Sequence, residues 1–133
     1  MKPLIWSLFL SFLLTQVAAA QIRTGEVERV VSLNRWLEQG GEQVVVFSSP
    51  ACRYCTLIKP EIQAVAREQR EIKFGEFNAA TAPLERAKHR VSGFPTTIFF
   101  RDGREVSRKV GYVRQNELRS WLRNYQGIRG TRR

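Results

Sequence analysis

The feature that most constrains the fold of this chain is a short apolar run followed at once by two cysteines. Residues 44–47 read Val-Val-Val-Phe, and a continuous β-branched and aromatic run is typical of a strand buried on both faces, as in a parallel sheet. A Ser-Ser-Pro sequence ends that strand, and apolar residues then recur at helical spacing from about residue 51 to residue 70. Cys52 and Cys55 therefore stand where a central strand gives way to a helix.

The remaining elements are predicted from periodicity and turn residues. Pro60 lies inside the helix after the cysteines, and because proline removes one helical hydrogen bond and crowds the preceding turn, we expect a kink rather than two helices. Asp102-Gly103 supplies the positive φ angles of a tight hairpin turn. Further helices are expected at residues 24–40, 83–89 and 116–125, and further strands at residues 72–77, 96–100 and 105–110.

Residues 1–20 have the composition of a signal peptide. Lys2 precedes an apolar run over residues 4–17, which is shorter than the roughly 20 residues that span a bilayer, and three alanines follow it. We therefore expect cleavage after about Ala20 and one domain over residues 21–133, of which residues 125–133 form a basic tail. The mature chain is expected to be periplasmic or secreted, with no transmembrane segment.

The charge of the chain is strongly basic, with 22 lysine and arginine residues against 12 acidic residues and a formal net charge of +10. Except at the arginine-rich end, these bases are spread along the whole chain, and an exported protein rarely meets chromosomal DNA. A solvated basic surface is therefore favoured over a binding site for nucleic acid or an acidic partner, which would lie at the tail.

The chain contains two cysteines, and only two residues separate them. In an oxidising compartment they can form a disulfide, but so short a loop constrains the unfolded chain little, so a purely structural bond would be inefficient. Reversible redox chemistry is therefore favoured over an inert disulfide and over metal binding. Structural zinc takes four ligands, and His89, the one histidine, is expected on the exposed side of a short helix. We expect no metal and no cofactor.

The order of elements and four local motifs resemble the thioredoxin family over nearly all of residues 21–133. The motifs are Cys52-Arg53-Tyr54-Cys55 at a helix start, Pro60 within that helix, Gly93-Phe94-Pro95-Thr96 before the hairpin, and Gly111 after the last strand. The resemblance implies an α/β thioredoxin fold, in which helices flank a central mixed sheet of four to five strands. It also implies that Pro95 is in the cis form beside the dithiol.

The chain departs from thioredoxins proper around the dithiol. Ala51 stands where they have tryptophan, and Arg53-Tyr54 stands where they have Gly-Pro. Val46 occupies the position of their buried acid, and Glu76 occupies the position of their lysine. A tyrosine directly before the second cysteine looks more like the exported disulfide isomerases and the glutaredoxins. The resemblance therefore implies the fold and the dithiol chemistry, but not the identity of a general reductant.

Dithiol chemistry gives the two cysteines different roles. The thiolate is the nucleophile, and Cys52 at the helix N-terminus, beside the permanent charge of Arg53, stands where the anion is favoured. Cys55 lies one turn deeper and is assigned the resolving step. Without an acid at Val46, deprotonation of Cys55 would need water or Glu76. Arg53 and Glu76 are therefore the residues expected to tune the pKa values of the thiols.

Substrate contacts are expected from Phe94, Pro95 and Tyr54. The resemblance implies that a cis Pro95 presents the backbone of the preceding residue to an extended peptide, which pairs with it like an added strand, while Phe94 adds apolar contact. The alternative for Pro95 is a proline that merely begins a strand. Tyr54 either touches the substrate or covers the cysteines, and the sequence favours neither.

These features predict an exported thiol:disulfide oxidoreductase that acts on protein disulfides through its CxxC dithiol. The reductase or isomerase direction is favoured over the oxidase direction, with a membrane protein as candidate electron donor. The expected partners are protein thiols and disulfides rather than nucleic acid, and the expected state is a monomer. The alternative is a non-catalytic thioredoxin-fold binding module that presents a basic surface in an envelope or secreted assembly.

Overall fold

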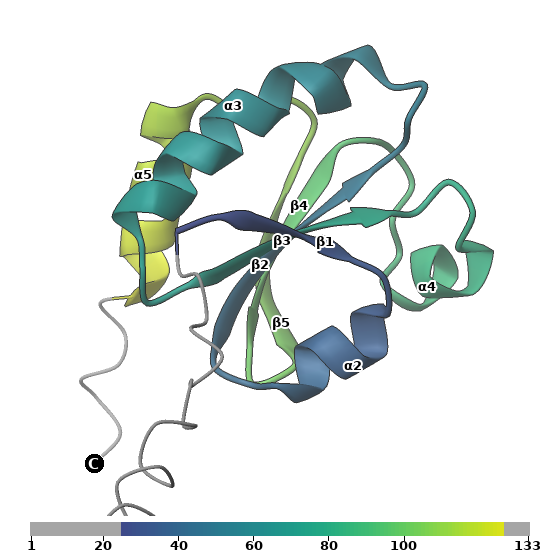
Figure 1. The fold of residues 1–133 in the computed structure, drawn as a ribbon, viewed down its shortest axis with the longest axis horizontal. Helices are drawn as coiled ribbons and strands as arrows, with labels where there is room; N and C mark the ends of the chain where they lie inside the picture. The colour runs from purple at the N-terminus through teal and green to yellow at the C-terminus, as the bar shows by residue number, and fades with distance from the viewer. Residues whose placement is uncertain (1–24, 127–133) are drawn as a thin grey trace, which may run out of the picture.

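The computed structural model describes residues 25–126 and confirms the α/β thioredoxin fold with a mixed five-stranded sheet (Figure 1). The strands are β1 (Val27–Val30), β2 (Glu42–Ser48), β3 (Lys73–Asn78), β4 (Thr96–Arg101) and β5 (Arg104–Val110). The helices are α2 (Leu33–Glu38), α3 (Arg53–Glu68), α4 (Pro83–Lys88) and α5 (Gln115–Gln126). The expected signal peptide and residues 127–133 of the expected basic tail lie outside the described residues.

Strand β2 is central in the sheet, whose order is β1-β3-β2-β4-β5. It pairs parallel with β3 and antiparallel with β4, and each of its residues is buried. Val44 and Val46 belong to the core cluster that contains side chains of α3 and α5, whereas Val45 and Phe47 belong to the cluster that contains side chains of α2. Helices α3 and α5 lie on one side of the sheet, and α2 and α4 lie on the other (Figure 1). The predicted burial of this run on both faces is confirmed, because helices cover both faces of the sheet.

The prediction of a helix over residues 24–40 is wrong for the first half of that range. The structure forms strand β1 there, and the helix α2 begins only at Leu33. Val27 and Val30 lie opposite Phe74 and Phe77 of β3 in parallel register, so pairing with a distant strand overrides the local helical spacing. Val31, expected on the apolar face of a helix, is instead 88% exposed.

The other predicted elements are confirmed. The turn between β4 and β5 has Asp102 at φ 50° and Gly103 at φ 76°, the two positive values that a type I′ hairpin turn requires. Helix α3 runs through Pro60 as one helix, and α5 buries Leu118, Trp121 and Leu122 against the sheet. Within residues 25–126, none of the helices combines the length and the apolar character that crossing a membrane requires.

Gly75 of β3 permits α2 to pack closely on the sheet. A Cβ atom at this position would overlap the Val30 side chain and lie 3.1 Å from the Trp36 ring, and the β-branched Val30 has little rotamer freedom with which to move aside. We expect Gly75→Ala to lower the free energy of unfolding by about 1–3 kcal/mol through overpacking, as measured by urea unfolding. In Gly93→Ala, the matched control, the added Cβ meets open space, and an equal loss in both variants would contradict this account.

Candidate active site

The two cysteines form a disulfide at the N-terminal end of α3, with their Cα atoms 5.2 Å apart. Cys52 is the N-cap residue of α3, and its sulfur accepts the backbone N–H of Cys55 at 3.1 Å. An N-cap acceptor satisfies one of the N–H groups that the first helical turn leaves unpaired. The Cys52 sulfur therefore lies at the positive end of the helix dipole, and no acidic side chain in the first turn opposes that field.

The two cysteines differ in their access to solvent. Cys52 is partly exposed, whereas Cys55 is 2% exposed. Arg53, directly after Cys52, is exposed and places a permanent positive charge at the same helix end. Tyr54, between the two cysteines, is 57% exposed. The chain thus leaves one cysteine partly exposed and buries the other.

Glu76 belongs to a polar network beside Cys55. It lies opposite Val46 in the parallel register of β3 and β2, and its Oε1 atom accepts the Ser48 hydroxyl at 2.8 Å and lies 3.1 Å from the Lys59 Nζ atom. A cavity of about 320 Å³ is lined by Cys55, Val46, Lys59 and Glu76, among others. The structure therefore brings the predicted Glu76 to the same cavity as Cys55.

Lys59 and Ser48 were not identified from the sequence. Lys59 follows Cys55 by one helical turn, so the spacing places both on one face of α3, and this spacing could have found it. Ser48 was interpreted only as a strand breaker. Its role depends on the pairing of β2 with β3, which places Asn78 opposite Ser48 and brings Glu76 within reach.

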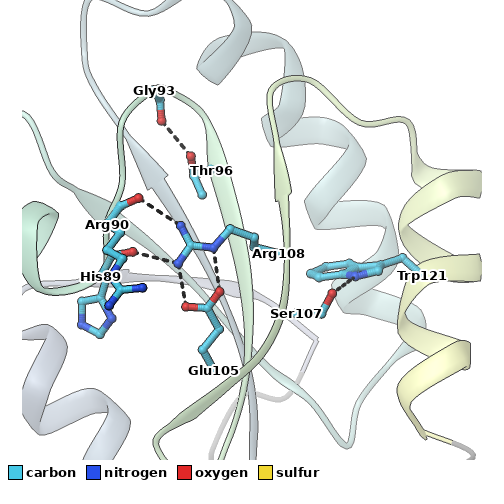
Figure 2. Close-up of polar contacts among 8 residues, drawn as sticks. All are labelled: His89, Arg90, Gly93, Thr96, Glu105, Ser107, Arg108 and Trp121. Carbon is cyan, nitrogen blue, oxygen red and sulfur yellow. Dashed lines mark hydrogen bonds and ion pairs between the residues drawn. The ribbon is translucent and has the colours of Figure 1, made fainter.

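The loop of Phe94 and Pro95 lies at the same end of the sheet as the dithiol, because Thr96 at the start of β4 pairs with Phe47 near the end of β2. The Phe94–Pro95 bond is cis, as the resemblance implied. The Thr96 hydroxyl donates to the Gly93 carbonyl at 2.7 Å (Figure 2), and the Gly111 N–H donates to the Pro95 carbonyl at 2.8 Å. Pro95 directly precedes β4, which is an interior strand rather than an edge strand.

An exposed tyrosine after β5 is tied to the helix that carries the dithiol. The Tyr112 hydroxyl donates to Glu61 of α3 at 2.9 Å, and this hydrogen bond raises the pKa of Tyr112. The other carboxylate oxygen of Glu61 accepts the backbone N–H of Gln115 at 2.9 Å. Tyr112 and Leu57 are exposed large apolar residues. Helical spacing groups Leu57 with the apolar residues Ile58 and Ile62, but only the latter two are buried.

His89 is half-buried, not exposed as expected. Its ring lies between Phe47 and Phe100, with ring centroids 5.7 and 5.6 Å away, and its Nε2 atom is buried without a hydrogen-bond partner among residues 25–126. Burial, with the charges of Lys88 and Arg108, lowers the pKa of His89 against the opposing pull of Glu105 and Glu85. Within the described residues, no group of three or more His, Cys, Asp or Glu side chains is placed to hold a metal ion.

The lowered pKa of His89 predicts a loss of stability in mild acid. The unfolded chain takes up this proton near the ordinary pKa of about 6.5, whereas the folded protein takes it up only at lower pH. The free energy of unfolding should therefore fall as the pH is lowered from about 7.5 to about 5. Urea unfolding across this range should show a smaller fall for His89→Gln. Equal falls in both proteins would contradict the prediction. Glu68 does not contribute to the fall, because Arg119 lowers its pKa from 4.5 and it titrates below this range.

Comparison with known proteins places this arrangement among thioredoxin-like structures. A family model described as a thioredoxin-like domain matches residues 31–126. The thioredoxin of Mycoplasmoides gallisepticum is 26% identical over 74% of this chain and 92% of its own length. The thioredoxin structure from Trypanosoma brucei brucei superposes with a TM-score of 0.70 at 25% identity, covering 80% of this chain and 96% of that one. A thioredoxin structure from Halobacterium salinarum, at 19% identity, shares the fold with a TM-score of 0.70 over 77% of this chain and 92% of its own.

Proposed function

This chain belongs to the family of thioredoxin-like domains, and from that premise we propose that it is an exported enzyme in which Cys52 attacks the disulfides of other proteins. Thiol-disulfide oxidoreductase activity is supported by the related thioredoxins and by the CxxC pair. The observation that carries the proposal is the asymmetry of the dithiol. Cys52 caps the positive end of α3 and is partly exposed, whereas Cys55 is buried one turn below.

The proposed reaction transfers two electrons from the reduced dithiol to a substrate disulfide. The Cys52 thiolate attacks one substrate sulfur, the substrate disulfide breaks, and the second substrate sulfur leaves as a thiolate that takes up a proton. The Cys55 thiol then loses its proton and attacks the Cys52 sulfur of the mixed disulfide. The first substrate sulfur leaves, the Cys52–Cys55 disulfide forms, and the substrate is released as a dithiol. The reverse sequence oxidises a substrate dithiol.

Glu76 is the proposed acceptor of the Cys55 proton. It lines the same cavity as Cys55, and the Ser48 hydroxyl and Lys59 ammonium hold its Oε1 atom from two sides. A cavity of this size admits water, so the proton can pass to Glu76 directly or through one water.

Replacing Glu76 by glutamine should slow the resolving step by roughly 10²-fold, the lower part of the range for positioned acid–base groups, because an amide cannot accept the Cys55 proton. Formation of the mixed disulfide should change little. A rapid-mixing assay that follows release of substrate from a Cys52 mixed disulfide measures the step. Glu68→Gln removes an ion-paired glutamate at the far end of α3 and is the matched control; unchanged release in Glu76→Gln would remove Glu76 from the mechanism.

Protein substrates are proposed to bind across the dithiol end of the sheet. Phe94 and Pro95 lie on the loop before β4, Tyr54 lies between the cysteines, and exposed Leu57 and Tyr112 add apolar surface from α3 and from the connection after β5. An extended peptide can pair with the loop backbone while its side chains contact these residues. We take the protein to act as a monomer, with a membrane protein as electron donor.

Export and the direction of the reaction are tested separately. Residues 1–20 fused to leaderless alkaline phosphatase should direct the enzyme across the membrane of a Gram-negative cell, and phosphatase that stays inactive inside the cell would contradict export. The mature protein should accelerate insulin reduction by dithiothreitol and reactivate scrambled ribonuclease. If it only oxidises reduced ribonuclease, the reductase or isomerase direction is wrong; if it does none of these, the protein is not an oxidoreductase of protein disulfides.

A further inference from the structure

Helix α4 ends in a motif that is followed by two backbone carbonyl groups, and both accept hydrogen bonds from another element. The Val91 N–H donates to the Arg86 carbonyl and the Arg90 N–H to the Ala87 carbonyl, which is the pattern of a Schellman motif. Arg90 takes the left-handed position at φ 52°, where glycine is usual. The carbonyls of His89 and Arg90 lie beyond the last turn and receive their donors from β5.

Arg108 supplies those donors. Its guanidinium donates to the His89 carbonyl at 2.8 Å and to the Arg90 carbonyl at 3.1 Å, and both carboxylate oxygens of Glu105 accept from it at 2.6 Å (Figure 2). The planar fork of arginine suits this task, because one side chain can meet a carboxylate and two carbonyls in fixed geometry, which a lysine ammonium cannot do.

A β-bulge places Glu105 and Arg108 on the same side of β5. Residues three apart in a regular strand point to opposite faces. Here Phe99 pairs with Ser107 and Phe100 pairs with Glu105. Val106 is therefore the extra residue of the bulge, and it shifts the alternation of side chains between the two faces of β5 by one residue. Glu105 and Arg108 thereby face the end of α4 together. Bulges of this kind re-aim side chains next to functional sites.

The anchored segment leads directly into the Phe94–Pro95 loop. Val91 is buried, and the Thr96–Gly93 and Gly111–Pro95 hydrogen bonds fix the far end of the loop. The guanidinium of Arg86, on α4, lies 5.0 Å from the centroid of the Phe94 ring. The end of α4, held by Arg108, is therefore connected to Phe94 both through the chain and through this contact.

We propose that Arg108, oriented by Glu105, is a positioning residue that holds the Phe94–Pro95 loop in place for protein substrates. This inference rests on the proposed function, since it assumes that the loop binds substrate protein. Among the described residues, the guanidinium of Arg108 bonds to Glu105, His89 and Arg90 rather than to the dithiol, so we expect the reactivity of Cys52 itself not to depend on it. Its loss should weaken binding of protein disulfides and leave exchange with a small disulfide intact.

The test compares Arg108→Met with Arg119→Met in the mature protein. The control removes an arginine that is also held by two carboxylate contacts of 2.6 Å, but by Glu68 at the α3–α5 contact. For Arg108→Met, kcat/KM for insulin should fall by about ten-fold, mostly through a higher KM. The rate with a small aromatic disulfide should stay within about two-fold of wild type, which shows that the dithiol remains intact. Arg119→Met should match wild type with both substrates.

Two further variants keep the test decisive. Arg108→Lys should recover part of the insulin activity, and Glu105→Gln, which leaves the guanidinium in place but loosens it, should raise KM less than Arg108→Met does. If Arg108→Met loses both activities equally, or if wild-type KM for insulin is retained, Arg108 does not position the loop. If Arg108→Met does not fold, an unchanged KM in Glu105→Gln overturns the inference. If the wild type itself reduces only the small disulfide, the proposed protein substrate is wrong instead.

Discussion

Replacing Cys52 by serine is expected to abolish disulfide exchange, with a fall in rate of at least about 10³-fold, while the protein stays folded. A serine hydroxyl neither attacks a disulfide nor forms one with Cys55, so both steps of the reaction are lost. The same hydroxyl is a good N-cap acceptor, so it can take over the contact that the Cys52 sulfur makes with the Cys55 N–H. Insulin reduction and a small-disulfide assay measure the rate, and circular dichroism measures the fold.

The matched control for this substitution is Ala51→Ser, which introduces a hydroxyl at the exposed neighbouring position. It should keep both activities close to wild type. A Cys52→Ser protein that retains more than a trace of exchange would show that Cys55 or another group carries the reaction. If the Cys52–Cys55 disulfide is only structural, the wild-type protein will show no activity in either assay.

Replacing Cys55 by alanine is expected to stop turnover on protein disulfides and to trap the substrate on Cys52. The first attack still occurs, because Cys52 keeps its place at the end of α3, but no second thiol is present to release the adduct. Adducts should therefore accumulate in the exporting cell and appear on non-reducing gels as bands that dithiothreitol removes. Mass spectrometry of those bands identifies the natural partners.

Two companion variants define the result for Cys55→Ala. The double variant that lacks both cysteines should form no adduct. Cys52→Ala, which keeps only Cys55, should form few adducts, because Cys55 is 2% exposed. Adducts that form equally well on Cys55 alone would reverse the assigned roles of the two sulfurs.

The parts of the fold that local chemistry determines were predictable from the sequence. The apolar run of β2 indicated burial on both faces, and Asp102-Gly103 indicated the hairpin turn, because each depends on its own residues. Strand β1 was not predictable in this way. Val27 and Val30 have helical spacing as well as β-branched side chains, and the pairing with β3, whose residues lie far along the chain, decides between the two.

The same distinction separates the parts of the candidate site. Cys52 and Cys55 were identifiable because one strand end and one helix start place both, and the cis form of Pro95 was implied by the family resemblance. The partners of Glu76 and Arg108 were not identifiable, since Ser48 meets Glu76 through strand pairing and Arg108 of β5 meets the His89 carbonyl at the end of α4. A bulge that reverses the alternation of β5 cannot be read from the residues of that strand alone.

The most direct test of the central claim labels the reduced protein with less than one equivalent of iodoacetamide at neutral pH and locates the label by peptide mapping. The predicted result is carbamidomethylation of Cys52 with Cys55 unmodified, because Cys52 combines the helix N-terminus with exposure to solvent. Equal labelling of the two cysteines, or labelling of Cys55 first, would contradict the account.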